Sequence, residues 1–424
     1  MQEYCVVVPF YNGKELCAVV TYDSHNCRQL GSEQFAELLQ CRSILKVFLT
    51  KSIYDEVRKK SEIYNAFTLE ITYAIANNNI TARYENLLAL LKPGRYPYKF
   101  LNGIYSVRNV SVKELKNISK YYFFRYSQCI KRIQDDDNSK CLEREMKLFP
   151  INFYGIIVEE IQETGKVKRI HRKCHTNQYG TVTARITTSN PNIQGLSKEE
   201  WKTVVPHKGR VILTADYSAI DLLIGALLAE DYELAKKCVN TDIHTENCKE
   251  IFGVCTDSLR KIIKSMVYSV MYGAGKEQCI KKLNKVSDEL KQTTLSANEI
   301  YDKLQILLGS ILTYRNGLAD EGCTTGGRHF CFARNKIEKY KRLSYIIQSI
   351  QSEVLKEALI MLQEYDYLLL VTIHDSIIIE VNKNAVQSAC QNLAFIMQKA
   401  FCDVMKTELK INIKLERKGD FHYE

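Results

Sequence analysis

Residues 211–221 read Val-Ile-Leu-Thr-Ala-Asp-Tyr-Ser-Ala-Ile-Asp, and residues 368–376 read Leu-Leu-Leu-Val-Thr-Ile-His-Asp-Ser. In each stretch an aspartate, Asp216 or Asp375, follows an apolar run typical of a buried β-strand. Two carboxylates raised on neighbouring strands can hold a pair of divalent cations. Such cations assist in-line phosphoryl transfer, because one activates the attacking oxygen and the other neutralises the leaving group. A nucleotide-joining enzyme is therefore the first hypothesis.

The composition is that of a globular protein with excess positive charge. The chain has 424 residues, is 46% apolar and is long enough for two or three domains. Its formal net charge of +10 favours a polyanionic partner such as nucleic acid. No apolar run approaches the roughly 20 residues that span a bilayer, and the N-terminus lacks a signal-peptide pattern. We therefore expect no membrane association and a cytoplasmic location, in a nucleoid or in a host cell, with an organelle left open.

The 15 cysteines are scattered, with no Cys-x-x-Cys pair, which indicates reduced core thiols rather than a disulfide frame or a zinc site. A second pattern interleaves basic and aromatic residues over 328–342. Its members are Arg328, His329, Phe330, Phe332, Arg334, Lys336, Lys339, Tyr340, Lys341 and Arg342. Basic groups neutralise phosphates while rings stack on bases, so this stretch is a candidate nucleic-acid contact. A solvated loop is the alternative.

The first 165 residues predict a small α/β unit followed by a helical hairpin. In the α/β unit we expect strands at Tyr4–Phe10, Ala18–Tyr22 and Ile44–Leu49, a turn at Asn12-Gly13 and a helix at Ser32–Gln40. Residues 92–106 are rich in Pro and Gly and predict a linker. Helical patterns then cover about Val112–Ile133 and Leu142–Glu163. From Lys166 onward, strands and helices alternate without repeats.

Between the two aspartates, functional side chains recur at every fourth residue. They are Arg260, Lys264, Tyr268 and Tyr272, with Gly273 next. On an α-helix this step drifts by about 40° each time, so the four share one broad face. A guanidinium and an ammonium one turn apart suit a triphosphate, and the next ring would lie beside the sugar and base. An exposed basic helix is the alternative, but it leaves the two tyrosines unexplained.

These three stretches resemble motifs A, B and C of family A DNA polymerases, the DNA polymerase I group, in the right order. The quoted residues are Asp216-Tyr217-Ser218, Ile220-Asp221-Leu222, the helix from Arg260 to Gly273, and His374-Asp375. Residues 183–194, Asp242-Ile243-His244-Thr245, and the segment with Gln348 and Glu353-Val354-Leu355-Lys356 resemble further family segments. The resemblance covers roughly residues 166–424.

The resemblance implies an α+β right-hand polymerase fold, with an antiparallel palm sheet, helical fingers and a short helical thumb. We expect the palm and fingers in 166–424, with the fingers at about 235–325, and the abbreviated thumb in 106–165. Residues 1–105 would be a small α/β domain, interpreted as a degenerate ribonuclease H-like exonuclease remnant. No Asp-x-Glu pair is found on the expected strands of this domain, so we predict no proofreading.

The resemblance also implies roles for the motif residues. Asp216 and Asp375 would hold two Mg²⁺ ions, with the Tyr217 backbone carbonyl as a further ligand and Mn²⁺ as a substitute. Arg260 and Lys264 would bind the triphosphate, and Lys264 would protonate the departing pyrophosphate. The other nucleotide-binding residues would be Tyr268, Asp221 and His244. Contacts with template and primer would come from Arg185, Gln194, Tyr272, Gln348 and His374.

Two departures from the family pattern predict differences in behaviour. Asp221 stands where the family usually has a glutamate that excludes the ribose 2′-hydroxyl, so looser sugar discrimination is one hypothesis. Ser376 replaces the carboxylate that usually follows the metal-binding aspartate. Ala219 and Leu223 replace the usual glutamine and arginine of motif A. The short thumb predicts low processivity without a processivity factor or other replication protein.

The resulting hypothesis is a template-directed DNA polymerase whose partners are primer–template DNA and deoxynucleoside triphosphates. One alternative is a single-subunit RNA polymerase-like enzyme, which also reads His-Asp-Ser in motif C. Tyr268, Asp221 and the segment 185–194 favour DNA synthesis. The other alternative is a catalytically inactive DNA-binding replication factor, which could lose Asp216 or Asp375 without consequence.

Overall fold

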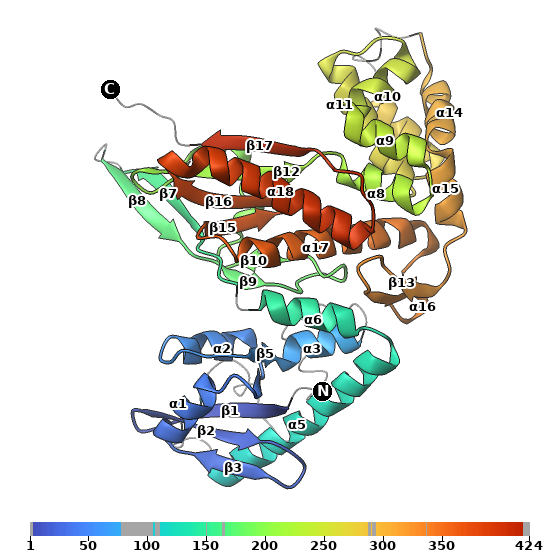
Figure 1. The fold of residues 1–424 in the computed structure, drawn as a ribbon. Helices are drawn as coiled ribbons and strands as arrows, with labels where there is room; N and C mark the ends of the chain where they lie inside the picture. The colour runs from blue at the N-terminus through green and yellow to red at the C-terminus, as the bar shows by residue number, and fades with distance from the viewer. Residues whose placement is uncertain are drawn as a thin grey trace. The chain divides into compact units, whose positions relative to one another are not determined.

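The computed structural model describes residues 3–77, 105–106, 111–149, 151–162, 166–286, 290, 294–335 and 337–418. The fold is α+β and consists of two compact units (Figure 1). The first unit comprises Met1–Ile151, Asn177–Thr187 and Gly327–His329, and the second comprises Asn152–Thr176, Thr188–Gly326 and Phe330–Glu424. No helix in the described part of the chain is long and apolar enough to cross a membrane.

The first unit is built on a mixed sheet of order β3-β2-β1-β4-β5, with β6 also paired to β1. Its strands are β1 (Tyr4–Asn12), β2 (Glu15–Thr21), β3 (Cys27–Leu30), β4 (Leu45–Phe48), β5 (Ala66–Thr68) and β6 (Tyr105–Ser106). β1, β2 and β3 are antiparallel, whereas β4 and β5 continue parallel to β1. The turn predicted at Asn12-Gly13 is confirmed, since Asn12 pairs with Glu15 and Gly13 has a φ of +64°.

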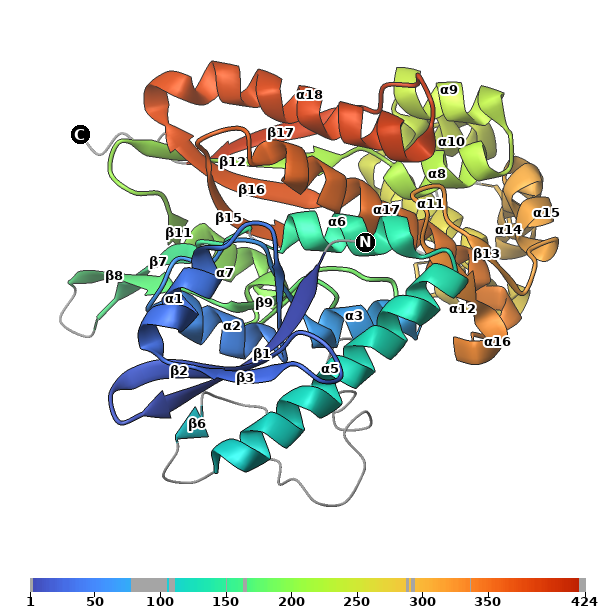
Figure 2. The same cartoon turned by 60° about the horizontal axis from the view of Figure 1, so that its bottom comes forward.

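Helices cover this sheet and complete the core of the first unit. They are α1 (Ser32–Gln40), α2 (Lys51–Arg58), α3 (Leu69–Ala76), α5 (Val112–Asp135) and α6 (Ser139–Leu148). The long helix α5 runs along β1, β2 and β3 (Figure 2). Its Leu115, Ile118 and Tyr122 join the buried cluster that also holds Val6 and Val19. Burial of this apolar stripe, rather than helix propensity, is what fixes α5.

Of the two helices predicted for the hairpin, one is present in full and the other only in its first half. The first is confirmed by α5, but the second is wrong beyond Leu148. A strand, β7 (Ile156–Ile161), replaces its second half and pairs with β8 (Val167–Arg172). Pro150 in the sequence disfavours helix continuation, and Gly155 has a φ of +89° that suits only glycine well. The thumb assignment of α5 and α6 stays a prediction, and residues 92–104 of the expected linker lie outside the described residues.

The second unit contains a four-stranded antiparallel sheet of order β15-β16-β12-β17. Its strands are β12 (Arg210–Tyr217), β15 (Leu368–Ile373), β16 (Ser376–Asn382) and β17 (Ile413–Lys418). Helix α18 (Val386–Met405) packs on β12, β16 and β17, and α17 (Arg342–Leu362) packs against α18 (Figure 1). Because α18 covers one face, the apolar residues of the central strands are buried, among them Leu213, Ile377 and Ile379.

A group of helices extends from the end of β12. It consists of α8 (Ile220–Leu228), α9 (Tyr232–Asn240), α10 (Ile243–Phe252), α11 (Asp257–Met271), α12 (Lys276–Asn284), α14 (Ala297–Leu307) and α15 (Gly309–Asn316). Polar caps start several of them: Asp231 caps α9, Asp242 caps α10 and Thr256 caps α11.

The remaining elements are short. The strands are β9 (His175–Asn177), β10 (Thr187–Ser189), β11 (Val204–Val205), β13 (Glu321–Cys323) and β14 (His329–Cys331). The helices are α7 (Lys198–Lys202), α16 (Phe332–Asn335) and the single turns η2 (Ile193–Gly195), η3 (Lys339–Lys341) and η4 (Lys383–Ala385). All 15 cysteines are free thiols.

Candidate active site

Strand register brings Asp216 to the end of the central sheet. β12 and β16 pair antiparallel, with Ala215 opposite Ile377. At the next position the Ser376 hydroxyl donates a hydrogen bond of 2.5 Å to Asp216 Oδ1. Because side chains alternate along a strand, the buried Ala215 packs inward while the neighbouring Asp216 is half-buried. The strand end thus presents a carboxylate that is already oriented by a hydroxyl.

Asp375 lies in the tight turn that joins β15 to β16. Ile373 pairs with Ser376, so His374 and Asp375 form the whole connection. His374 has a φ of +54°, as short hairpin turns require at their central positions, and its side chain is exposed. The turn residue Asp375 is therefore next to Ser376, which contacts Asp216. The sheet brings the two predicted aspartates to the same end, as the sequence predicts.

Tyr217 follows Asp216 but points the other way. Its hydroxyl donates to the Met397 carbonyl at 2.9 Å, and the ring is buried. Burial, and then the negative charge of Asp375, raise the pKa of Tyr217 well above its usual value. The side chain is therefore a packing group, and only the backbone carbonyl of Tyr217 suits a metal ligand.

The oxygen atoms at this end of the sheet suit Mg²⁺. Within the described ranges, no group of three or more His, Cys, Asp or Glu side chains is arranged to hold a metal. Mg²⁺ is commonly bound by only one or two carboxylates, while waters and substrate phosphates complete its octahedron. Asp216, Asp375 and the Tyr217 carbonyl fit that pattern. They fit it better than the closed four-ligand site of a structural zinc.

Helix α11 carries the predicted cationic face. Its apolar side is buried through Leu259, Ile263 and Met266. On the other side Lys264 is exposed, and Arg260 and Tyr268 are half-buried. The i, i+4 spacing therefore places these side chains in one row, as the sequence predicts.

Arg260 is held by the first turn of α10. Its Nε and Nη2 donate to Oδ2 and Oδ1 of Asp242, each at 2.8 Å, and Nε also donates to Thr245 Oγ1 at 3.1 Å. The hydrogen bonds from Arg260 lower the pKa of Asp242 to about 2, and the same pairing raises the pKa of Arg260. The sequence places Asp242 in a family segment, but nothing in its local spacing marks it as the partner of Arg260.

His244 lies against Tyr268. His244 Nε2 and the Tyr268 hydroxyl are 3.1 Å apart, and the rings meet edge to face with centroids 5.5 Å apart. Burial, followed by the positive charges of Lys264 and Arg260, lowers the pKa of His244 to about 4. The imidazole is therefore neutral at pH 7. Its position supports the Tyr268 ring, and a contact with triphosphate stays a prediction.

A second polar cluster surrounds Asp221, in the first turn of α8. The Tyr272 hydroxyl donates to Asp221 Oδ1, and so does Gln351 Nε2 at 2.5 Å. The Tyr272 ring stacks on Tyr268, with centroids 6.4 Å apart and planes 22° apart. Burial, and then the charge of Asp221, raise the pKa of Tyr268, with Asp375 adding to the shift. The sequence did not predict a role for Gln351. The only sign of one is that a polar residue lies on the buried side of α17.

Four other predicted contact residues lie in different settings. Gln194 joins residues 188–194 to β15, because its amide donates to the Thr372 carbonyl at 2.8 Å and accepts from the Thr188 backbone. Gln348 is partly buried on α17, and His374 is exposed in its turn. Arg185 belongs to the first unit, where its backbone N–H donates to Thr181 Oγ1 at 3.0 Å. Roles for these residues in binding nucleic acid stay predictions.

The proposed nucleic-acid contact at 328–342 is wrong for its first residues. Arg328, Phe330 and Phe332 are at most 6% exposed, so they pack in the interior and cannot stack on bases. Arg328 lies over the Tyr179 ring at 5.3 Å. Alternation of basic and aromatic residues did not distinguish a core segment from a binding loop. Only Tyr340, at 48% exposure, presents a large ring to solvent in the described part of this stretch.

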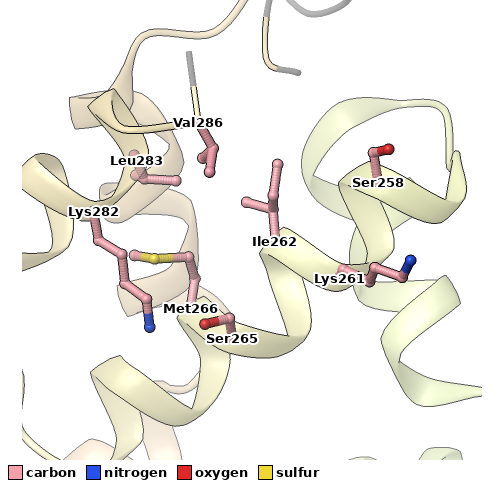
Figure 3. Close-up of a pocket in the computed structure, with 8 residues that line it drawn as sticks. All are labelled: Ser258, Lys261, Ile262, Ser265, Met266, Lys282, Leu283 and Val286. Atoms are coloured by element: carbon pink, nitrogen blue, oxygen red, sulfur yellow. The ribbon is translucent and has the colours of Figure 1, made fainter. Parts of the chain in front are cut away.

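Two cavities lie along α11. One, of about 310 Å³, opens between α11 and α12 and is lined by Ile262, Met266 and Leu283 with Lys261 and Lys282 at its sides (Figure 3). The other, of about 500 Å³, is lined by Tyr268, Tyr272, Gly273 and Tyr340, among others. Gly273 has a φ of +93°, and a Cβ there would lie 2.6 Å from the Tyr340 carbonyl oxygen. Only glycine allows the chain to pass this close.

Comparison with known proteins identifies the family. The family model for DNA polymerase family A matches residues 152–420. The chain is 27% identical over 277 residues to DNA polymerase I of Borreliella burgdorferi, covering 59% of this chain and 30% of that protein. It is 24% identical to the thermostable DNA polymerase I of Thermus filiformis (59% and 33% covered) and 21% identical to DNA polymerase theta of Caenorhabditis elegans (91% and 24% covered).

The chain thus spans about a third or less of the length of these relatives. Among solved structures, the fold matches the POL domain of Pol1 from M. smegmatis in complex with DNA primer–template and dNTP, with a TM-score of 0.73 and 14% identity. The match covers 97% of this chain and 94% of that one, so the predicted α+β polymerase fold is confirmed. Because the family model spans more than half of the sequence and includes both aspartate stretches and α11, the chain belongs to DNA polymerase family A.

Proposed function

We propose that this chain is a template-directed DNA polymerase that adds deoxynucleotides to a primer 3′-hydroxyl and releases pyrophosphate. One observation carries the proposal. The strand pairing of β15, β16 and β12 brings Asp216 and Asp375 together, in the same compact unit as the basic face of α11. Burial raises the pKa of Tyr268 on that helix, and the charges of Asp221 and then Asp375 add to the shift. These observations support the proposal that the basic face of α11 would bind phosphate beside a metal site held by the two aspartates.

Asp216 and Asp375 would hold two Mg²⁺ ions, with the Tyr217 carbonyl as a further ligand and Mn²⁺ as a substitute. When bound, these ions would lower the pKa of the primer hydroxyl and neutralise charge on the triphosphate. The hydroxyl would release its proton to solvent and its oxygen would form a bond to the α-phosphorus, while the bond from that phosphorus to the oxygen bridging to the β-phosphate would break. The Ser376 hydroxyl keeps Asp216 oriented throughout.

The α11 residues would act on the triphosphate. Arg260, already fixed by Asp242, would bind it as a fork, and Lys264 would bind it as a point charge. Lys264 would then give a proton to the departing pyrophosphate. Tyr268 would pack against the incoming sugar, with neutral His244 supporting its ring. Asp221 would face the sugar 2′ position.

Primer–template DNA and deoxynucleoside triphosphates are the proposed partners, with a processivity factor or another replication protein as a further one. Template and primer would be contacted by Arg185, Gln194, Tyr272, Gln348 and His374. Support comes from the solved relative, which was captured with primer–template and dNTP. We propose a cytoplasmic site of action, in a nucleoid or in a host cell, with an organelle left open.

We further propose that residues 1–105, which contain strands β1 to β5 of the first unit, descend from a ribonuclease H-like exonuclease and do not proofread. The strand order β3-β2-β1-β4-β5, with β4 and β5 parallel to β1, supports the descent. The middle of β1, Val6–Val8, is apolar and buried where a catalytic carboxylate would be needed. Release of nucleotides from a mismatched primer by the wild-type chain would contradict this proposal.

Primer extension on a synthetic template tests the main proposal. We expect Mg²⁺-dependent addition of the one nucleotide that complements each template base, with deoxynucleotides preferred over ribonucleotides. Asp216→Ala should abolish addition while leaving DNA binding measurable by fluorescence anisotropy. Binding without extension by the wild-type chain would instead favour a DNA-binding replication factor, and preferred ribonucleotide addition would favour an RNA polymerase.

A further inference from the structure

The carboxylate of Asp221 accepts hydrogen bonds from two different helices. One donor is the Tyr272 hydroxyl, at the end of α11, and the other is the Gln351 amide, in the middle of α17. Both donate to the same oxygen, Oδ1. Gln351 is 6% exposed, so its amide has little access to solvent. A buried amide that donates to a carboxylate restricts the carboxylate's rotation far more than a solvent-exposed amide would.

Local backbone geometry adds to this restriction. Asp221 lies in the first turn of α8, where the positive end of the helix dipole favours an anion. Ala219, the residue just before α8, has a φ of +50° and provides no side-chain cap. Helix α17 packs directly against α8. Gln351 therefore reaches Asp221 across a packed helix pair, and its position is set by the core.

We propose that Gln351 is a specificity-determining residue that positions Asp221 against the 2′ carbon of the incoming sugar. The inference rests on the proposed function. An aspartate is one methylene shorter than the glutamate usual at this position, so by itself it would leave more room for a 2′-hydroxyl. The Gln351 and Tyr272 donors hold the shorter carboxylate in one rotamer. Because its Oδ1 already accepts two hydrogen bonds, that oxygen is a poor acceptor for a ribose hydroxyl.

The hydrogen bonds to Asp221 also connect this carboxylate to Tyr268, the ring proposed to pack against the incoming sugar. Tyr272, which donates to Asp221, is stacked on Tyr268, and Tyr268 contacts His244. A carboxylate that turns away from Gln351 would therefore also loosen Tyr272. The predicted consequence is weaker exclusion of ribonucleotides, expressed in their KM, with little change in the rate of deoxynucleotide addition.

Single-nucleotide incorporation kinetics test the inference. The ratio of kcat/KM for a dNTP to that for the matching rNTP is measured for wild type, Gln351→Met, Asp221→Ala and the double variant. Gln351→Met keeps the length of the side chain and removes the donor. We expect its ratio to fall on the order of tenfold, mainly through a lower rNTP KM, as for loss of a hydrogen bond to a charged group. In the Asp221→Ala background the same change should have no further effect.

Gln363→Met is the matched control, since Gln363 is an exposed glutamine at the end of the same helix. It should leave the ratio unchanged. Gln351→Glu is a second variant of similar volume in case Gln351→Met does not fold. A protonated Glu at this position can donate to Asp221 and an ionised one cannot, so its ratio should be higher at pH 6 than at pH 8.

Two results would overturn the inference. One is an unchanged ratio in Gln351→Met, and the other is an equal fall in the Asp221 and Asp221→Ala backgrounds, which would show that Gln351 does not act through Asp221. Both require a wild-type chain that extends primers. A wild type that extends none contradicts the proposed function itself, so the two failures are distinguishable.

Discussion

Arg260 and Asp242 are joined by two parallel hydrogen bonds, from Nε to Oδ2 and from Nη2 to Oδ1, each 2.8 Å long. Asp242 also caps α10, so the pair links the start of α10 to the first turn of α11. The guanidinium that we propose for the triphosphate is thus fixed before a nucleotide arrives. Such pre-organisation lowers the entropy that binding would otherwise lose.

Replacing Arg260 with lysine should weaken nucleotide binding more than it slows chemistry. A lysine keeps the charge but cannot donate through two parallel N–H groups to Asp242. We expect Arg260→Lys to raise the KM for dNTP on the order of tenfold with a smaller effect on kcat. Lys261→Ala removes an exposed charge on another flank of α11 and should change KM little. Steady-state primer extension measures both, and a dominant loss of kcat in Arg260→Lys would contradict the pre-positioning role.

The Asp242 pair should also contribute to stability in acid. Its folded-state pKa of about 2 lies below the ordinary value of 3.8, so the contribution is complete above pH 3.8 and is lost as the pH falls toward 2. The side chain is half exposed, so the effect is small and declines with salt. Urea unfolding between pH 5 and 2 should show a shallower loss for Asp242→Asn than for wild type. An equal loss of unfolding free energy with falling pH in the two proteins would contradict a stabilising Asp242–Arg260 pair.

His244 predicts a separate pH dependence. Its pKa is lowered from 6.5 to about 4, so the unfolded chain binds the proton more readily than the folded one. The contribution of neutral His244 to the free energy of unfolding is therefore fully present above pH 6.5. It declines as the pH falls toward 4, by on the order of 1 to 3 kcal/mol. Denaturation curves for His244→Gln should lack this decline. A decline of equal size in the variant would assign it to other groups.

Ser376→Ala should weaken the response to Mg²⁺ without abolishing activity. The hydroxyl donates to Asp216 Oδ1, and its loss frees that carboxylate to rotate. We expect the Mg²⁺ concentration for half-maximal extension to rise several-fold, as when a metal ligand loses its supporting hydrogen bond. Ser388→Ala, which changes an exposed serine at the start of α18, is the control. An unchanged Mg²⁺ dependence in Ser376→Ala would mean that the hydroxyl does not orient Asp216.

The aspartates and the α11 row could be predicted from the sequence because each depends on local spacing. Apolar runs ending at Asp216 and Asp375 identify strand ends, and the i, i+4 spacing identifies a helix face. Gln351 and the Asp242 partner of Arg260 could not be found in this way, because their contacts cross between helices. The burial of Arg328 and Phe330 likewise depends on tertiary packing. The helical periodicity of the sequence continues past Pro150, so it predicts a helix where the structure has the strand Ile156–Ile161.

The central claim is that Asp375 takes part in metal-assisted nucleotide addition, and Asp375→Ala tests it most directly. Primer extension with Mg²⁺ is compared for wild type, Asp375→Ala and Asp366→Ala. Asp366 is an exposed aspartate just before β15, the strand that Asp375 follows. Wild type and Asp366→Ala should extend the primer alike. Asp375→Ala should bind the same DNA with unchanged affinity and lose extension by at least about a thousandfold, since the metal site contributes several kcal/mol to the transition state. Extension by Asp375→Ala at the wild-type rate would contradict it.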